Sequence, residues 1–321
     1  MVTGAGGFIG RHVLERFRAA GSEVLGIVRP GAGTRPPVEG VRFIERDLAA
    51  AQSLADVLRP RDTIVHLAAR AHRIFDDAID PLDAFRRANV APVRMLCRSA
   101  AEAQVRRLLF VSSAKVFGEG RLAPYTLRDQ PAPADAYAQS KWEAEQIIRA
   151  AAKEAGFTYT ILRPPFVYGP GGKGNFPRLL SLARVAARVP LPLGGITNQR
   201  SMLFVGNLAD LIHACALSEA AANQTYLPTD GTDVSTPELL RAIAKARGER
   251  SLLFSVPLWM LRAPARMLGR TAEINRLTES LRLDPELLLD ELRWRPPFTL
   301  EQGLARSVRS ERTKPPERVD D

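Results

Sequence analysis

The sequence predicts an α/β fold, a doubly wound parallel sheet followed by a smaller α/β lobe that would bind a substrate. A glycine-spaced turn lies at the start of the chain, and apolar runs of strand length then alternate with helical patterns. After about Leu162 the pattern changes to a Pro/Gly-rich passage. Strands that alternate with helices form parallel sheets, and right-handed crossovers bring the carboxyl ends of the strands to one edge. We expect the functional site at that edge.

The first element is a strand that ends in a turn containing Gly4, Gly7 and Gly10. This spacing lets the backbone approach a pyrophosphate closely, with the N-terminus of a helix aimed at the negative charge. Apolar residues recur at helical spacing over residues 8–17, as that helix requires. The turn therefore predicts a bound dinucleotide, as in the Rossmann fold.

The first strand is unusually short, because only Met1 and Val2 precede Thr3. A buried parallel strand normally needs about five residues. We expect a truncated strand with a few apolar residues upstream; a shortened strand that the sheet tolerates is the alternative.

The remaining elements of the first domain follow in alternation. Apolar runs of strand length cover residues 24–28, 41–44, 63–67, 108–112 and 159–162. Helical patterns cover residues 52–58, 82–104 and 138–155. We expect a dinucleotide-binding domain over residues 1–165.

Residues 166–309 are expected to form mainly the substrate lobe, with a part around 200–220 returning to the first domain. Helical patterns in this part cover residues 176–188, 236–247, 257–268 and 285–292. The segment 257–270 is apolar with interspersed arginines, and we expect a core-packing helix rather than a helix on a membrane surface. Residues 310–321 are polar, contain prolines and are expected to be disordered.

Composition narrows the class of protein. The 321 residues are 45% hydrophobic and 25% charged, and no apolar run approaches the roughly 18–20 residues of a membrane span. No secretory signal precedes the glycine turn, so we expect a cytoplasmic protein without an integral membrane segment. The net charge is +10, but the basic residues are dispersed. This argues against nucleic-acid binding and favours a phosphorylated small substrate.

The cysteines and histidines show no metal-ligand spacing. Cys97 and Cys215 each lie in a helical pattern among apolar residues, and we interpret both as small buried hydrophobes. No ligand spacing links the four histidines either, His12, His66, His72 and His213. We expect no metal site.

A second motif places chemistry at the same edge of the sheet. Tyr137 and Lys141 are four residues apart, which a helix brings to one face, and a predicted strand delivers Ser112 and Ser113. Hydride transfer at a carbonyl or carbinol carbon requires a proton to move on the oxygen. Lowering a tyrosine pKa from about 10 to about 7 needs roughly 4 kcal/mol, which the Lys141 ammonium and a positive nicotinamide ring would supply. Ser113 would orient the substrate oxygen.

With these motifs the chain resembles the extended short-chain dehydrogenases/reductases, the NAD-dependent epimerase/dehydratase family, over nearly its full length. The matching pieces are Thr3-Gly4-x-x-Gly7-x-x-Gly10, Asp47-Leu48, His66-Leu-Ala-Ala69, Asn89, Ser112-Ser113, Tyr137-x-x-x-Lys141 and Arg163-Pro-x-x-Val-Tyr-Gly-Pro170.

The resemblance implies a set of residues that contact the dinucleotide. These are Gly4, Gly7, Phe8, Ile9, Gly10, Arg29, Asp47, Leu48, Leu67, Ala68, Ala69, Asn89, Tyr137, Lys141 and Pro164. It also implies Ser113, Tyr137 and Lys141 as catalytic residues. For a nucleoside-diphosphate sugar it implies contacts in the second lobe from Lys115, Phe166, Asn175, Arg200 and Arg276, with Arg282 as the alternative to Arg276. An arginine suits a diphosphate through bidentate bonding.

Two departures from the common 4-epimerase pattern bear on the reaction. Arg29 stands where NAD enzymes carry an acidic residue after the second strand, so NADP is as plausible as NAD. Phe117 and Phe166 replace polar residues expected at the sugar pocket, which favours a 6-deoxy or N-acetylated sugar. Packing drift explains the two phenylalanines nearly as well.

The resemblance is greatest to reductases of UDP-4-keto-6-deoxy-N-acetylhexosamines, so we expect a C4 reductase of surface-polysaccharide (O-antigen) synthesis, with NADPH slightly favoured. A UDP-glucose or UDP-N-acetylglucosamine 4-epimerase with tightly bound NAD is the alternative. A non-catalytic dinucleotide sensor is disfavoured because Ser113, Tyr137 and Lys141 are all present. Relatives pair through the helices expected at 82–104 and 138–155, so we expect a homodimer.

Overall fold

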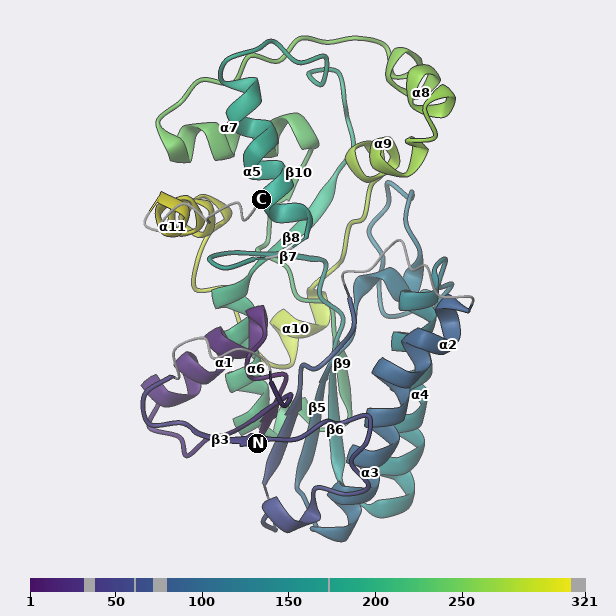
Figure 1. The fold of residues 1–321 in the computed structure, drawn as a ribbon, viewed down its shortest axis with the longest axis vertical. Coiled ribbons are helices and arrows are strands. Elements are labelled where there is room, and N and C mark those ends of the chain that lie inside the picture. The colour runs from purple at the N-terminus through teal and green to yellow at the C-terminus, as the bar shows by residue number, and fades with distance from the viewer. Residues whose placement is uncertain (32–37, 61, 72–79, 173, 313–321) are drawn as a thin grey trace.

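A computed structural model describes residues 1–31, 38–60, 62–71, 80–172 and 174–312. Two lobes lie one above the other in Figure 1, with the larger sheet in the lower lobe. This main sheet has seven parallel strands in the order β3-β2-β1-β4-β5-β6-β9. Its strands are β1 (Val2–Thr3), β2 (Leu25–Val28), β3 (Arg42–Glu45), β4 (Thr63–His66), β5 (Arg107–Val111), β6 (Thr158–Leu162) and β9 (Gln224–Tyr226). The predicted doubly wound sheet is thereby confirmed.

Helices cover both faces of the main sheet, as in other sheets built from parallel strands. On one face α1 (Phe8–Ala19) packs against α6 (Val205–Leu217). On the other face α3 (Ala91–Glu102) packs against α4 (Ala136–Ala155), the long helix at the right of Figure 1. The strand order changes direction between β1 and β4, where such folds bind their ligands.

The helix expected over residues 82–104 has three parts. A short α2 (Pro81–Phe85), capped by the Asp80 side chain, leads into a π turn at Arg86–Val90 and then into α3. Pro92 near the start of α3 has no N–H to donate, so the backbone cannot continue as a regular α-helix through this point.

The helix α4 carries the candidate catalytic pair. The Asp135 carboxylate caps its N-terminus by accepting from the backbone N of Ala138 at 2.7 Å. Gly156, in the left-handed conformation, ends it. Because these caps fix both ends, Tyr137 lies in the first turn and Lys141 one turn further along.

The upper lobe is built on a second sheet of three strands in the order β10-β8-β7. Its elements are β7 (Phe166–Tyr168), α5 (Asn175–Ala186), β8 (Arg200–Phe204), β10 (Asp233–Val234), α7 (Thr236–Arg247), α8 (Leu258–Met267), α9 (Thr271–Thr278) and α11 (Leu300–Arg312). Between β8 and β10 the chain returns to the main sheet as α6 and β9. The short α10 (Glu286–Asp290) also packs there, through Leu287 and Leu288.

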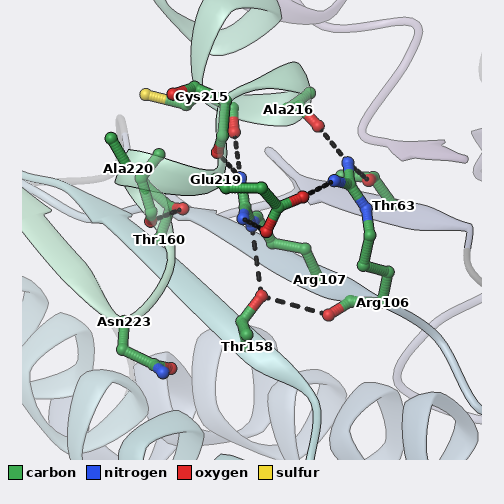
Figure 2. Close-up of polar contacts among 12 residues, drawn as sticks. Thr63, Arg106, Arg107, Thr158, Thr160, Cys215, Ala216, Glu219, Ala220 and Asn223 are labelled. Carbon is green, nitrogen blue, oxygen red and sulfur yellow. Dashed lines mark hydrogen bonds and ion pairs between the residues drawn. The ribbon is translucent and has the colours of Figure 1, made fainter. Parts of the chain in front are cut away.

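The amino edge of the main sheet holds a fully buried arginine, shown in Figure 2. Arg107, the first residue of β5, donates from Nη1 to the carbonyls of Cys215 and Ser218, each at 2.5 Å. These carbonyls lie at the C-terminus of α6, where backbone acceptors lack partners within the helix. Arg106 forms an ion pair with Glu219 at 2.7 Å beside them. The two arginines tie α6 to the edge of the sheet.

Several local expectations need correction. Residues 52–58 contain only a short 3-10 turn at Ala55–Val57, which holds no buried residue. The helix α8 is not core-packing, since Ala265 is its only buried residue. Residues 310–312 belong to α11 rather than to a disordered tail, and the rest of that expected tail, 313–321, lies outside the described residues. In the part of the chain that the structure describes, no helix has the length and apolar character to cross a membrane.

Candidate active site

The glycine turn after β1 packs directly against the segment that follows β4. Gly4 has a φ of +68°, and a Cβ on it would lie 2.7 Å from the backbone N of Ala68. Gly7 donates from its backbone N to the Gly4 carbonyl at 2.9 Å, and a Cβ on Gly10 would collide with that same carbonyl. Side chains at Gly4 and Gly10 would therefore push the turn away from its neighbours.

The N-terminus of α1 begins at this turn and has the properties of an anion site. Gly7 is its N-cap, no side chain caps it, and its first turn holds no acidic residue. Free N–H groups and the positive end of the helix dipole suit a pyrophosphate. The residues present thus fit a dinucleotide, with Phe8 and Ile9 in the first helical turn, half-buried against the upper lobe.

Residues at the expected adenosine end lie at the carboxyl ends of β2 and β3. Arg29 is exposed directly after β2, and Asp47 and Leu48 follow β3. The Asp47 carboxylate accepts from the backbone N of Ala49 at 3.0 Å. Sequence reasoning missed Arg46, whose backbone N donates to the Val28 carbonyl at 2.9 Å and which therefore lies beside Arg29. The feature of the sequence that could have identified Arg46 is its position directly after β3, the strand next to β2.

The segment after β4 contains a buried neutral histidine. His66 is bonded through Nδ1 to the Thr3 hydroxyl at 2.7 Å, and burial lowers the pKa of His66 to about 3. Leu67 and Ala68 are half-buried next to the glycine turn, and Ala69 is exposed. These residues follow β4 at the point where the strand order changes direction.

Asn89 holds the loop that follows this segment. Its Oδ1 accepts from the backbone N of Arg70 at 2.8 Å, and its Nδ2 donates to the Ser140 hydroxyl at 2.9 Å. Asn89 is buried, and its two polar atoms already bond to protein. It therefore joins the loop to α4, and the dinucleotide contact that the resemblance implies for Asn89 stays a prediction.

The ends of β5 and β6 bring Ser113 and Pro164 to the carboxyl edge. Beyond the strands, Ser112 donates from N to the Leu162 carbonyl at 2.7 Å, and Ala114 donates to the Pro164 carbonyl at 2.9 Å. Ser113 lies between these two bonds, and its side chain is close enough to the Tyr137 hydroxyl to lower the pKa of Tyr137. The structure therefore brings together the serine and tyrosine that were predicted as a pair.

The pKa of Tyr137 lies above its ordinary value in the structure without ligands. Burial raises the pKa of Tyr137 to about 12; the contact with Ser113 opposes this shift, and the Asp135 carboxylate adds to it. The expected lowering to about 7 depends on a bound nicotinamide ring as well as on Lys141, so it stays a prediction for the complex; without the coenzyme, desolvation of this half-buried ring outweighs the contact with Ser113. Without ligands, Tyr137 is therefore protonated at neutral pH. It has the state that a proton donor to a ketone oxygen needs.

Lys141 is buried one helical turn beyond Tyr137. Its side chain is 2% exposed, and its Nζ lies 4.1 Å from the centroid of the Phe110 ring. Burial lowers the pKa of Lys141 to about 7, and the Glu145 carboxylate opposes that shift. Within the described residues, no hydrogen bond engages the Lys141 ammonium. It is therefore free to bind the hydroxyls of a ribose.

A buried ionic cluster below Lys141 was missed by sequence reasoning. Glu145 accepts from the Ser112 hydroxyl at 2.5 Å and from Arg163, through Nη2, at 2.7 Å. All three side chains are buried, and the Arg163 guanidinium lies 4.7 Å from the centroid of Phe117. The sequence feature that could have identified this cluster is Glu145, an acidic residue four positions after Lys141 and therefore on the same helix face. The cluster locks α4 to the ends of β5 and β6.

A chain of charges leads from the catalytic helix to the upper lobe. Lys115 donates to Asp135, the cap of α4, at 3.0 Å and lies 3.9 Å from Glu119. Glu119 in turn lies 3.4 Å from Arg200 on β8. Arg200 also donates to the backbone carbonyl of Arg276 at 2.6 Å. Three of the candidate substrate residues are thereby brought together.

The structure separates the two alternatives for the second arginine. Arg282 pairs with Asp233 at 2.6 Å. Arg276, on α9, has no ion pair or side-chain hydrogen bond within the residues that the structure describes, and it adjoins Arg200. This favours Arg276 as the group open to an anionic ligand.

The two phenylalanines predicted at the sugar pocket belong to different hydrophobic clusters. Phe117 is 3% exposed and stacks on Tyr125, with ring centroids 5.3 Å apart. It therefore belongs to the core, and its apolar character says nothing about the sugar. Phe166 is half-buried on β7, paired with Met202 of β8. Asn175 is half-buried at the start of α5.

The two cysteines lie in the core. Cys97 and Cys215 are free and buried, and burial raises the pKa of each thiol to about 12. Over the described ranges, no group of three His, Cys, Asp or Glu side chains could hold a metal ion. His72 lies outside these ranges.

The sheet order, the glycine turn and the Ser–Tyr–Lys set define the class of the protein as an extended short-chain dehydrogenase/reductase. The chain belongs to the NAD dependent epimerase/dehydratase family, whose model matches residues 1–227.

Individual relatives agree with this assignment. The chain is 36% identical over 313 residues to a UDP-glucose 4-epimerase of Vibrio cholerae, covering 97% of this chain and 94% of that protein. It is 28% identical over 274 residues to an N-acetyl-alpha-D-glucosaminyl-diphospho-ditrans,octacis-undecaprenol 4-epimerase of Escherichia coli O157:H7, covering 84% and 77%. MoeE5, solved in complex with UDP-glucuronic acid and NAD, superposes with a TM-score of 0.76 at 25% identity, covering 97% and 98%.

Proposed function

We propose that the protein reduces the C4 keto group of a UDP-4-keto-6-deoxy-N-acetylhexosamine with NAD(P)H, in the synthesis of a surface polysaccharide such as O-antigen. The observation that carries this proposal is that Ser113 and Tyr137 lie next to each other at the carboxyl edge of the sheet, with Tyr137 protonated at neutral pH. A reductase needs a proton donor at the ketone oxygen, and this pair lies at the edge of the sheet where the dinucleotide cradle opens.

Each residue of the pair has one task in this reaction. Ser113 hydrogen-bonds the C4 oxygen and orients it. Tyr137 donates its proton to that oxygen as the carbonyl is reduced, and the nicotinamide coenzyme, when bound, supplies the hydride. Lys141 binds the ribose beside the nicotinamide, and its charge stabilises the tyrosinate that remains.

NADPH is the favoured coenzyme in this proposal. Arg29 and Arg46 lie beside each other after β2 and β3, where an adenosine 2′-phosphate would lie. Arg29 is exposed, and an arginine binds a phosphate with two parallel bonds. NAD is the alternative, and the solved neighbour MoeE5 holds NAD.

A UDP-sugar is the proposed substrate. Arg200 and Arg276 of the upper lobe would face its diphosphate, and Phe166 would lie against the sugar ring. Arg200 is one-fifth exposed, so a ligand can reach it. The name of the Vibrio relative specifies UDP-glucose and supports this class of substrate. The name of the Escherichia relative specifies N-acetylglucosamine joined through a diphosphate to a lipid, which supports a sugar diphosphate more generally.

The test measures the absorbance of the reduced coenzyme. Purified protein is given NADPH or NADH together with UDP-4-keto-6-deoxy-N-acetylglucosamine that is made in situ. Stoichiometric consumption of coenzyme is expected. Arg29→Ala should weaken the preference for NADPH, whereas Arg128→Ala, at an exposed arginine elsewhere, should leave it unchanged. A preference that is equal in all three proteins contradicts the role of Arg29.

A 4-epimerase is the second candidate, because the Vibrio relative at 36% identity carries that name. The same residues would serve it, with Tyr137 alternating between base and acid. Interconversion of UDP-glucose and UDP-galactose, or of their N-acetyl forms, without added coenzyme would establish this reaction. Such a result, with no consumption of NADPH, contradicts the reductase.

We also propose a homodimer through α3 and α4. A shallow groove runs between these helices on their outer face, lined by Ala91, Met95, Ala101, Ile147, Ala151 and Ala155. Small residues allow helices of a second copy to approach closely. Ala101 is exposed, so Ala101→Arg should leave the fold intact and shift the mass measured by sedimentation from dimer to monomer. An unchanged mass contradicts this interface.

A further inference from the structure

The helix α8 lies at the outer end of the upper lobe, at the top right of Figure 1. It turns one narrow face inward: Leu258 and Leu261 are half-buried, and Ala265 is 6% exposed. These positions follow one another at intervals of three and four, which is one side of a helix. The rest of the helix is exposed.

The outward face of α8 is apolar. Trp259 is 68% exposed, Met260 is 47% exposed and Met267 is 89% exposed, and Leu268 directly after the helix is 71% exposed. Trp259 and Met267 are eight residues apart with Ala263 midway, so they share the side opposite the buried face. Of the eleven large hydrophobic residues that are exposed in the described chain, six lie between residues 252 and 268. A patch of this kind marks an interaction surface.

Basic residues flank this apolar stripe. Arg262, Arg266 and Arg270 recur every four residues, and residues 250–272 contain no Asp or Glu. All three arginines are exposed, and none has an ion pair or hydrogen bond from its side chain within the described residues. Other exposed arginines of this protein do pair with acids, as Arg11 does with Glu15. The α8 surface thus carries apolar area and uncompensated positive charge together.

We propose that this α8 surface, formed by Trp259, Met260, Met267 and Leu268 with Arg262, Arg266 and Arg270, binds the surface of an anionic phospholipid bilayer. An interfacial helix places its apolar side chains at the boundary of headgroups and acyl chains and its arginines among the phosphates. A tryptophan has its most favourable position at that depth. A second copy of this chain fits the surface poorly, because two unpaired arginine rows would face each other.

The position of the surface gives it a consequence for the site. α8 packs against α9, which carries Arg276, and the Arg276 carbonyl accepts from Arg200. Docking through α8 would therefore hold the upper lobe, with its two arginines, next to the bilayer. This inference stands on α8 alone and does not depend on which reaction the protein performs.

The test is co-sedimentation of the full-length protein with vesicles of phosphatidylcholine, with or without phosphatidylglycerol. Binding is expected to the anionic vesicles and to fall with added salt. Each arginine near an anionic surface contributes about 1 kcal/mol, about fivefold in the partition coefficient, so Arg266→Glu should lower that coefficient by about tenfold or more. Arg42→Glu, at an exposed arginine of β3, makes the same charge change far from α8 and should have little effect.

Two further measurements separate the apolar contribution. Trp259→Ser should lower binding by about tenfold. Its control, Leu217→Ser, alters a residue that is 63% exposed at the end of α6 and should have little effect. The fluorescence of Trp259, the most exposed of the three tryptophans, should shift to the blue on anionic vesicles and become protected from iodide.

Three outcomes would overturn the proposal. One is equal binding to neutral and anionic vesicles, and another is an equal loss in each variant and its control. The third is no binding to vesicles together with a change in sedimentation coefficient for Trp259→Ser alone, which would assign the surface to a second protein copy.

Discussion

Lys141, near the carboxyl edge of the main sheet, and Arg107, at its amino edge, are both buried cations, and burial lowers the pKa of each. Their donors are used differently. Arg107 gives hydrogen bonds to two carbonyls at the end of α6 and to the Thr158 hydroxyl at 3.1 Å. Lys141 lies against the face of Phe110, and none of its donors is bonded within the described chain.

The difference shows which edge is built for stability and which for a ligand. Burying a cation without hydrogen bonds is unfavourable, and at the amino edge backbone carbonyls offset part of that penalty by accepting from Nη1 of Arg107, while Nη2 lies 3.6 Å from Glu219. At the carboxyl edge the penalty persists, and a ligand with hydroxyl groups would relieve it. A buried cation that makes no hydrogen bond through any of its donors, as Lys141 does, is therefore a physical mark of a functional site.

The largest contrast is expected between two tyrosines. Tyr137→Phe should lower kcat by about 10²–10⁴-fold, because the proton donor is lost. Tyr226→Phe removes a hydroxyl that donates to the Ala220 carbonyl at 3.3 Å, near the amino edge, and should leave kcat within about twofold. Steady-state rates of both variants check this. An unchanged rate for Tyr137→Phe would overturn the proposed chemistry.

Next in size is the effect of Arg107→Met on stability. Two carbonyls at the buried end of α6 lose their donor, at about 1–3 kcal/mol each, so the free energy of unfolding should fall by about 3 kcal/mol or more. Urea denaturation measures it. Rates per folded molecule should persist, since Arg107 lies at the edge opposite the site. A loss of less than about 1 kcal/mol would contradict the role assigned to Arg107.

Lys141→Met should change the pH dependence of stability. The Lys141 pKa is about 7 in the folded protein and 10.5 as its ordinary value, so between these pH values the unfolded state binds more protons. The contribution of Lys141 to the free energy of unfolding therefore rises as pH increases from about 7 to about 10.5. The difference in the free energy of unfolding between the parent protein and Lys141→Met should therefore shift in favour of the parent as pH rises across that range, as denaturation curves at each pH would measure. A difference that stays constant with pH would show that the ammonium is not desolvated.

The smallest effect on stability is expected from lengthening β1, which has only two residues. Val2 pairs with Gly26 of β2 and Val65 of β4, and both of those strands begin before these residues, so they have no partner on β1 there. The Met1 amine donates to the Thr63 carbonyl at 2.8 Å, and burial lowers the pKa of that amine. An extension of four apolar residues before Met1 should raise Tm, by about 2–4 °C for each kcal/mol gained. A Gly/Ser extension of equal length is the control. Equal melting of both extended chains would contradict the idea of a truncated strand.

The sequence was sufficient where local spacing decides the structure. The glycine turn, the strand–helix alternation and the Tyr137–Lys141 spacing depend on neighbours within a few residues, and they predicted the sheet and the catalytic helix. β9 was missed because it has only three residues and pairs with β6, more than sixty residues earlier. Arg46 and Glu145 were missed because their importance comes from partners on other elements.

Two expectations were wrong for a related reason. The apolar content of α8 suggested a core helix, and Phe117 suggested a sugar pocket. Composition does not say which side of a helix meets the protein, nor whether an aromatic ring faces a cleft or a stacking partner. Only the packing of α8 through one narrow face, and of Phe117 against Tyr125 and Arg163, decides these points.

The interleaving of the two lobes has a consequence for synthesis on the ribosome. The Ser218 carbonyl, which accepts a hydrogen bond from Arg107, comes 111 residues after Arg107 in the chain, and β9 comes later still. Until these residues emerge, one face of the nascent sheet lacks α6, its last edge is unpaired and the arginine has no acceptors. Chain release before that point would therefore yield an aggregation-prone fragment. The first lobe cannot be completed before much of the second has been made.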